Sequence, residues 1–149
     1  MRTQKNQTAL AELKFSYQAL KRPLDVSEAR FSFKFLKHII CKPLSRHENE
    51  KYALFVNEAH QVFAWYKVQE YGKSGNCLQQ ISGLAKACNA YGIVLLKYSS
   101  EKAIVIDDVD ELFVNLCFDT CEKLQIDIVD YLICNSRTYL SYREKCLSN

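Results

Sequence analysis

Few side chains in this sequence combine the type and the spacing that metal binding requires. Cys117 and Cys121 lie four residues apart, so they would share one face of a helix, and cysteine thiolates are zinc ligands. However, no third or fourth ligand lies within sequence reach of the pair. Because cysteine is among the residues most often buried, we interpret both side chains as small apolar residues in or beside a core.

The histidines and a glycine-containing loop also lack a pattern typical of a site. The run Gly72-Lys-Ser-Gly75 lacks the first glycine of a phosphate-binding loop, so we reject this motif. Cys77 has no histidine neighbour in the sequence, although His38 or His60 could approach it in the fold. The three histidines show neither H-x-H nor HExxH spacing and are expected at the surface or at helix ends; they are His38, His47 and His60.

The composition is that of a soluble globular domain. The chain has 149 residues, of which 48% are hydrophobic and 25% are charged, and this length gives one domain an adequate core. No apolar run is long enough to span a bilayer, and the basic N-terminus leads into no signal-peptide core. We therefore expect a cytoplasmic protein whose seven cysteines, an odd number without a C-x-x-C pair, stay reduced.

The charge distribution gives weak support to nucleic-acid binding. The formal net charge is +3, and basic residues gather loosely in two parts of the chain, close to aromatic residues. Such clusters are more commonly a solvated surface than a nucleic-acid groove, so binding to DNA stays an alternative. The clusters consist of Arg2, Lys5, Lys14, Lys21, Arg22, Lys34, Lys37 and Lys42.

The N-terminal part is predicted to hold one strand and one helix, in a single domain over 9–149. Residues 1–8 are polar and are expected to be disordered, and apolar side chains then alternate over 9–17, as in a half-buried strand. The run 21–24 contains a proline and is interpreted as a connector.

A helix is expected next, capped by Asp25 or Ser27 and continuing to about Cys41. Its apolar face would be wide. The phenylalanines of this segment also alternate along the sequence, a pattern that would suit a strand. The apolar face consists of Phe31, Phe33, Phe35, Leu36, Ile39 and Ile40.

The middle of the chain predicts a hairpin and a second helix. Two runs rich in aromatic and branched residues, 51–56 and 62–68, are separated by a polar turn, as in a β-hairpin. A glycine-containing loop is expected over 71–76, and apolar residues at helical spacing predict a helix over 78–90.

The C-terminal part predicts a strand–helix–strand unit with parallel strands. Gly92–Leu96 is an apolar run that suits a strand buried on both faces, and 126–134 is the second strand, followed by a turn and a short strand at 139–142. Asp107 and Asp108 would open the helix between them, since short acidic side chains suit a helix N-terminus. Its predicted apolar face consists of Val109, Leu112, Phe113, Leu116 and Leu124.

Two segments of this C-terminal part resemble a known family. Ile126-Asp-Ile-Val-Asp-Tyr-Leu-Ile133 and Tyr139-Leu-Ser-Tyr-Arg-Glu144 resemble the end of the RadC-like JAB/MPN domain, a metalloprotease-type fold, whose strand reads Ile-x-(Val/Leu)-Leu-Asp-His-(Ile/Leu)-Ile. Its hairpin and its Arg-Pro connector are similar to 54–57 and 22–23, so the resemblance covers roughly 9–147, without the helix-hairpin-helix module of longer members. It implies an α/β fold, a mixed sheet flanked by helices in the JAB/MPN (cytidine-deaminase-like) architecture.

The resemblance also implies a metal site, which is degenerate in this chain. The family motif is His-x-His, seven residues and Ser-x-x-Asp, and an ungapped alignment places Lys97 and Ser99 at the two histidines. Asp107 replaces the serine and Asp110 falls on the acidic ligand, while Glu50 is the nearest match to the catalytic glutamate. A catalytic zinc needs three ligands with lone pairs, and a protonated lysine has none. We therefore expect no zinc cofactor, although active family members bind one.

The lysine at the first histidine position is compatible with two arrangements. In the first, the Lys97 ammonium sits where the zinc charge would lie and pairs with Asp110, so that the carboxylate is not buried alone. In the second, Lys97 extends to solvent and Asp110 is exposed on the first helical turn. The distance between the two side chains distinguishes them.

The resemblance implies a catalytically inactive, metal-free interaction or scaffold module with a protein partner, linked by family to DNA repair or mobile elements. Edge strands and surface aromatic residues are the expected contact sites, no membrane contact is expected, and a homo-oligomer stays open. One alternative is a metal-dependent hydrolase of the JAMM metallopeptidase or nuclease-like type, in which Asp107, Asp110 and Glu50 hold a hard metal ion. The other is a DNA-associated protein, whose affinity should fall steeply with salt.

Overall fold

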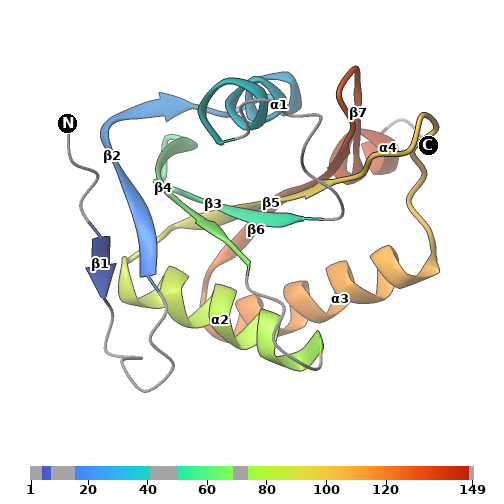
Figure 1. Cartoon of the computed structure of the whole chain (residues 1–149). Helices are drawn as coiled ribbons and strands as arrows, with labels where there is room; N and C mark the ends of the chain where they lie inside the picture. Colours follow the sequence, from blue (N-terminus) through green and yellow to red (C-terminus); the bar gives the residue numbers. More distant parts are fainter. Residues whose placement is uncertain (1–4, 8–15, 41–49, 69–73, 148–149) are drawn as a thin grey trace.

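One mixed seven-stranded sheet forms the centre of the computed structural model, which describes residues 5–7, 16–40, 50–68 and 74–147 (Figure 1). The strand order is β1-β2-β4-β3-β5-β6-β7, with β5 and β6 parallel and all other neighbours antiparallel. The predicted α/β class with a mixed sheet is therefore confirmed. The strands are β1 (Lys5–Gln7), β2 (Ser16–Asp25), β3 (Lys51–Val56), β4 (Gln61–Lys67), β5 (Gly92–Tyr98), β6 (Asp127–Cys134) and β7 (Tyr139–Ser141).

Helices cover both faces of this sheet (Figure 1). On one face lies α1 (Ala29–Phe35), which continues as the π-helical turn η1 (Leu36–Ile40), and on the other face lie α2 (Ser74–Ala87) and α3 (Asp108–Lys123). The short α4 (Tyr142–Leu147) follows β7. The core accordingly has two parts, one between the sheet and α1 and one between the sheet and the pair α2 and α3. In the described part of the chain, no helix combines the length and the apolar character needed to cross a membrane.

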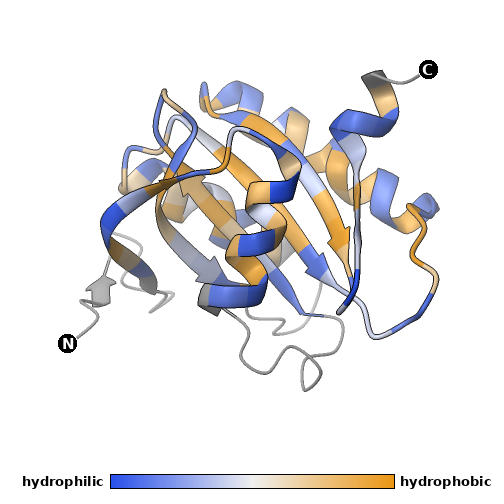
Figure 2. Ribbon diagram, turned by 90° about the horizontal axis from the view of Figure 1, so that it is seen from above, coloured by the Kyte–Doolittle hydropathy of each residue, from blue (hydrophilic) through white to orange (hydrophobic). Residues whose placement is uncertain are grey.

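The predicted hairpin and the strand–helix–strand unit are both confirmed. β3 and β4 pair antiparallel, and α3 connects the parallel strands β5 and β6. Six of the seven residues of β5 are buried, as expected for a strand covered on both faces, and Lys97 is the part-exposed residue. Figure 2 shows that apolar residues predominate along the central strands, where burial of such residues stabilises the fold most.

Gly92 begins β5 at a point where β6 lies very close. A Cβ atom at this position would lie 2.9 Å from Cγ2 of Val129 and 3.0 Å from the backbone oxygen of Asp127. Because a backbone atom cannot move aside cheaply, we expect Gly92→Ala to lower the free energy of unfolding by about 1–3 kcal/mol. Urea denaturation measures this change. Gly83→Ala, inside α2, is the control, since alanine favours a helix interior by about 1 kcal/mol; equal destabilisation at both positions would contradict close packing at Gly92.

Three predictions for the N-terminal part are wrong or fall outside the described residues. Residues 5–7, predicted to be disordered, form β1 beside β2; a backbone ladder needs no apolar side chains, so the polar composition hid this strand. Most of the strand predicted over 9–17 lies outside the described residues, and its end belongs to β2. The predicted connector 21–24 also lies within β2, whose register against β4 shifts between Ala19 and Leu24. A proline is tolerated at such an irregularity.

Helix boundaries differ from the predictions at two places. Glu28 is the N-cap of α1 and makes no side-chain cap hydrogen bond, whereas the predicted cap Asp25 accepts a hydrogen bond from the Ser27 backbone before the helix begins. Ser74–Asn76 belong to α2 rather than to a loop, and 71–73 lie outside the described residues. This helix ends at Ala87, before the predicted Ala90, because Asn89 adopts a left-handed φ of 57°.

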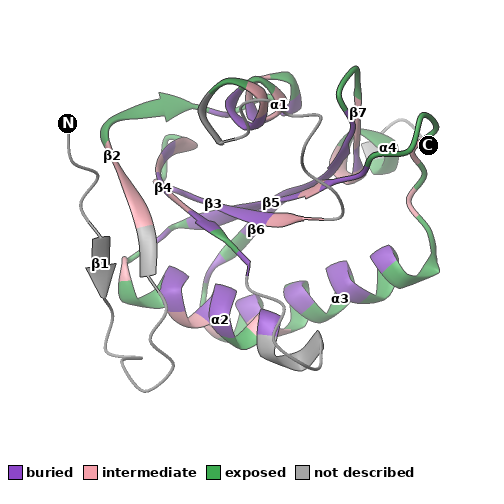
Figure 3. Ribbon diagram, in the orientation of Figure 1, coloured by how far each residue is buried: buried purple, intermediate pink, exposed green. Residues whose placement is uncertain are grey.

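The buried face of α3 is not the predicted one. Val109, Leu112 and Leu116 are exposed, and of the predicted face only Phe113 is buried and Leu124 partly so. Figure 3 shows that α3 is buried only on the side that faces the sheet. That side carries Asp110, Phe113, Val114, Cys117 and Cys121. The predicted face was chosen for its leucines. The inner positions of the helix are instead occupied by an acidic residue with buried hydrogen-bond partners and by two cysteines.

Candidate functional site

Three side chains from three elements meet under the sheet at the start of α3. Asp110 is only 3% exposed, and its Oδ1 accepts hydrogen bonds from Nζ of Lys97, at 3.1 Å, and from the hydroxyl of Tyr131, at 2.8 Å. Lys97 comes from β5 and Tyr131 from β6, so the parallel pair of strands brings both donors to the helix. The predicted pairing of Lys97 with Asp110 is therefore confirmed, and the alternative of an exposed Asp110 is wrong.

The second oxygen of Asp110 belongs to a capping box. Asp107 is the N-cap of α3, and its Oδ1 accepts from the Asp110 backbone at 2.8 Å, while Oδ2 of Asp110 accepts from the Asp107 backbone at 3.1 Å. Such reciprocal bonds satisfy two backbone donors that a helix N-terminus leaves without partners. Asp110 therefore holds the helix start and the ammonium at the same time.

The surroundings of Asp110 favour its ionised form. Burial by itself would raise the pKa of this carboxyl, but the three hydrogen bonds and the positive charge of the ammonium together hold the pKa below its ordinary value. The pKa of Tyr131 is raised, chiefly by burial and also by the charge of Asp110, so the phenol stays a neutral donor. The site is thus an ionised carboxylate held by three hydrogen-bond donors.

The other residues aligned with the metal site have separate partners. Glu50 lies just before β3 and bonds to Lys67, at 3.0 Å, and to the hydroxyl of Tyr52. Ser99 is buried, and its hydroxyl accepts from the Glu101 backbone at 3.3 Å. Neither is a partner of Asp110. The structure therefore brings Lys97, Asp107 and Asp110 together, while Glu50 and Ser99 bond elsewhere.

These residues do not fit a zinc ion. A lysine ammonium has three donors and no lone pair, and both oxygens of Asp110 already accept hydrogen bonds. Within 5–7, 16–40, 50–68 and 74–147, no three residues among histidine, cysteine, aspartate and glutamate gather in a way that could hold a metal. The donor set beside Asp110 is that of an ion-pair site.

The remaining candidates from the sequence lie apart from this site. Cys117 and Cys121 are buried in the core, as predicted, and burial raises the pKa of Cys117 to about 12 and that of Cys121 to about 11. His38 is exposed and His60 lies in the turn between β3 and β4, while His47 and Gly72 are outside the described residues. Cys77 is buried in the core beneath the sheet.

Two contributors were missed from the sequence. Lys51 on β3 is the register partner of Lys97 and places its ammonium 4.2 Å from the ring centre of Phe113, one turn after Asp110. Tyr131 is the other, although it stands where the resembled strand motif has a histidine. Both contacts join segments far apart in sequence, so only the sheet register could have predicted them.

A second buried carboxylate, Asp130, joins β6 to the C-terminal elements. Its Oδ1 accepts from the backbones of Tyr131, at 2.7 Å, and Arg143, at 3.0 Å, and its Oδ2 accepts from the hydroxyl of Ser141, at 2.6 Å. The same hydroxyl accepts from the Glu144 backbone at 3.1 Å and so caps α4. Asp130 is therefore a structural anchor, which no spacing rule had indicated.

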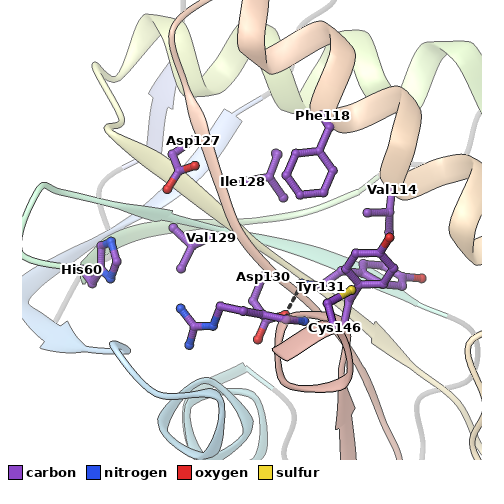
Figure 4. A pocket seen from close by; sticks show the side chains of 11 residues that line it. His60, Val114, Phe118, Asp127, Ile128, Val129, Asp130, Tyr131 and Cys146 are labelled. Atoms are coloured by element: carbon purple, nitrogen blue, oxygen red, sulfur yellow. Dashed lines mark hydrogen bonds between the residues drawn. The ribbon is translucent and has the colours of Figure 1, made fainter. Parts of the chain in front are cut away.

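An open pocket of about 460 Å³ lies beside β6. Its lining is mainly apolar and includes Val114 and Phe118 of α3 and Tyr142 of α4, and Tyr131 connects it to the Lys97 site. Figure 4 shows His60 and Cys146 at opposite ends of the pocket, so they do not form a nucleophile–base pair. This lining suits contact with an apolar side chain better than chemistry.

Comparisons with known proteins do not identify the chain. No family model matches the sequence, and no curated protein matches it either. Its functional interpretation therefore depends on the geometry of the site and on the resemblance of its motifs.

Proposed function

We propose that this chain is a metal-free relative of the JAB/MPN fold that works as an interaction module. One observation carries the proposal: the Lys97 ammonium lies 3.1 Å from a buried carboxylate at the position that corresponds to an acidic metal ligand. A cation on a side chain thus replaces the charge of a bound ion. The carboxylate keeps its partner, and the fold keeps its helix start without a metal.

The order of the elements supports the resemblance. After the two N-terminal strands and α1, the chain forms a hairpin, then α2, then a parallel strand–helix–strand unit with a short strand after it, and the hairpin and this unit lie where the resembled motifs place them. Asp130 lies in the Asp-Tyr pair of the β6 strand motif, and Ser141 in the Tyr-x-Ser tail, so the two motif segments contact each other directly. A hydrogen bond between them gives a physical reason for their joint occurrence.

The hydrolase alternative receives no support from the geometry. It requires Asp107, Asp110 and Glu50 to share a metal ion, but Asp107 caps α3, Glu50 pairs with Lys67, and the ammonium of Lys97 already faces Asp110. A divalent ion bound there would lie next to the Lys97 ammonium, and the two cations would repel each other. An interaction role, by contrast, leaves each of these carboxylates with its present hydrogen-bond partners.

Metal content tests the proposal directly. We expect the purified protein to hold no stoichiometric zinc by mass spectrometry, even after incubation with zinc and removal of the excess, because too few lone pairs converge on the site. The double variant Lys97→His/Ser99→His is the matched control, since it restores imidazoles at the two positions that the resemblance aligns with metal-binding histidines and should hold more zinc than the natural sequence. About one tightly held zinc per natural chain would be incompatible with a site built from an ammonium.

A further inference from the structure

The outer face of α3 carries an apolar stripe on an acidic helix. Val109, Leu112 and Leu116 follow each other at spacings of three and four residues, and they are 72%, 62% and 46% exposed. Val105, just before the helix, is 66% exposed. Residues at this spacing line one side of a helix, so the three side chains form a continuous surface, which we call the α3 stripe. A monomeric protein seldom leaves such a row of large side chains in water without use.

The inner face of α3 shows why this stripe is not a packing error. Asp110 is fixed toward the sheet by Lys97 and Tyr131, and Cys117 and Cys121 fill the inner side further along. Turning the helix to bury Leu112 would break the bonds of Asp110 and would expose both cysteines. The α3 stripe is therefore held outward by the same contacts that replace the metal site.

The charges around the α3 stripe indicate its partner. Asp108 lies one turn before Leu112, and Asp119 lies one turn after Leu116, so an exposed carboxylate stands at each end of the stripe. Glu111 and Glu122 are also exposed, and Lys123 is the single basic residue of α3. A partner that covers this surface should therefore present apolar side chains flanked by lysine or arginine.

A second copy of the chain fits this surface poorly. If two α3 helices packed on each other, in parallel or antiparallel orientation, the carboxylates of Asp108 and Asp119 would face carboxylates. Like charges at the rim of a helix pair oppose association. An anionic membrane or a nucleic acid would meet the same repulsion. A basic amphipathic helix has none of these conflicts, and a helix laid along an apolar row is a common recognition mode.

We infer that the α3 stripe, Val109, Leu112 and Leu116 with Val105, is a docking site for a basic amphipathic helix of a partner protein. This inference rests on the proposed interaction role and names the class of partner. Apolar contact supplies affinity, and the acidic ends set the orientation and favour basic over acidic helices. Lys97 does not contact the partner; it contributes to docking only because its bond to Asp110 fixes the rotation of α3 that turns the α3 stripe outward.

Peptide binding tests the inference. The probe is a fluorescein-labelled peptide of about 18 residues, long enough to form a helix on contact, with leucines at helical spacing and lysines elsewhere. Anisotropy titration of the full chain at low salt should give an affinity at least about tenfold higher than for the same peptide with glutamate in place of lysine. Raising the salt concentration should reduce this preference.

Variants locate the binding surface. Leu112→Glu should weaken binding of the lysine peptide by about tenfold or more, since it puts a charge in the centre of the contact. Leu24→Glu is the matched control, because Leu24 is a 39% exposed leucine on β2, and it should leave the affinity unchanged. Asp108→Asn/Asp119→Asn should lower affinity for the lysine peptide and reduce its salt dependence.

Three results of the peptide titrations would overturn the inference: equal affinity for the lysine and glutamate peptides, equal affinity of Leu112→Glu and the natural chain, and absence of binding at millimolar peptide. Sedimentation that shows a dimer dissociated by Leu112→Glu would assign the stripe to a second copy and would also overturn it. Metal content tests the Lys97 site and peptide affinity tests the α3 stripe, so the proposed function and this inference can fail separately.

Discussion

Replacing Asp110 by alanine should lower the free energy of unfolding by about 3–5 kcal/mol, the range for removal of one partner from a buried ion pair. The carboxylate is 3% exposed and accepts from Lys97, from Tyr131 and from the backbone of Asp107. Its removal leaves the buried phenol and a helix N–H without partners. The ammonium is less affected, because the Lys97 side chain is 24% exposed and can turn toward water.

Two further variants separate charge from volume at this site. Asp110→Asn keeps the size of the side chain but replaces one carboxylate oxygen by an NH₂ group. If the amide oxygen accepts from Lys97 and Tyr131, the NH₂ group faces the Asp107 N–H, and two donors then oppose each other. We therefore expect this variant to be less stable than the natural chain. Adding Lys97→Met to Asp110→Asn removes both charges, and this double variant should lose less stability than the two single changes summed. Urea denaturation of all four proteins gives the coupling. If the stability loss of the double variant equals the sum of the losses of the two single variants, Lys97 and Asp110 do not stabilise each other.

The pH dependence of stability should report the same carboxylate. The pKa of Asp110 is lowered in the folded protein, so its stabilising effect is fully present above the unfolded pKa of about 4 and is lost as pH falls through the folded value. The asparagine variant has no such group. The stability difference between the natural chain and Asp110→Asn should therefore narrow below about pH 4 and stay constant above it. A difference that widens on acidification would contradict an ionised Asp110.

The Lys97–Asp110 pair could be predicted as one of two arrangements, because the resemblance aligns both residues with metal-ligand positions. Lys97 is the second-last residue of β5 and Asp110 lies on the first turn of α3. Parallel strands joined by a helix bring these two positions to one side of the sheet. Tyr131 could not be predicted in the same way. It lies 21 residues after Asp110, and its contact depends on the register of β6 against β5, which no local pattern sets.

The rotation of α3 shows a different limit of sequence reasoning. Val109, Leu112, Phe113 and Leu116 recur at helical spacing and include two leucines, so hydrophobic periodicity favoured them as the core face over the smaller Val114, Cys117 and Cys121. The structure buries Asp110 instead, because its hydrogen bonds are available only on the side of the sheet. Periodicity assumes that polar residues prefer water, and this assumption fails where a carboxylate has several buried donors.

The N-terminal strands show a third limit. β1 is the polar run Lys5–Gln7, and β2 contains a proline, so neither has the composition of a typical strand. Both lie toward one end of the sheet order, where backbone pairing with a neighbour suffices and side chains need not enter a core. Composition therefore predicts central strands such as β5 far better than strands at an edge.

Replacing Asp130 by alanine should lower the free energy of unfolding by about 2–4 kcal/mol, since each buried donor left without a partner costs about 1–3 kcal/mol. The carboxylate is 5% exposed and accepts from the backbones of Tyr131 and Arg143 and from the hydroxyl of Ser141. These bonds hold the end of β7 and the start of α4 against β6. Hydrogen exchange should therefore become faster in Tyr139–Ser141 and in α4, while α2 should keep its protection.

Asp130→Asn should cost little stability, in contrast to Asp110→Asn. In Asp130→Asn the amide oxygen can still accept from both backbone N–H groups, and the NH₂ group can donate to the Ser141 oxygen, so the loss should stay below about 1 kcal/mol. At Asp110 all the partners are donors and include an ammonium, whereas at Asp130 the Ser141 hydroxyl can reverse its role. Equal losses for asparagine at the two positions would show that Asp130, too, is needed as a charge. If the contrast holds, Asp130 joins β6 to α4 by hydrogen bonding alone, and of these two carboxylates only Asp110, which pairs with Lys97, is needed as a negative charge.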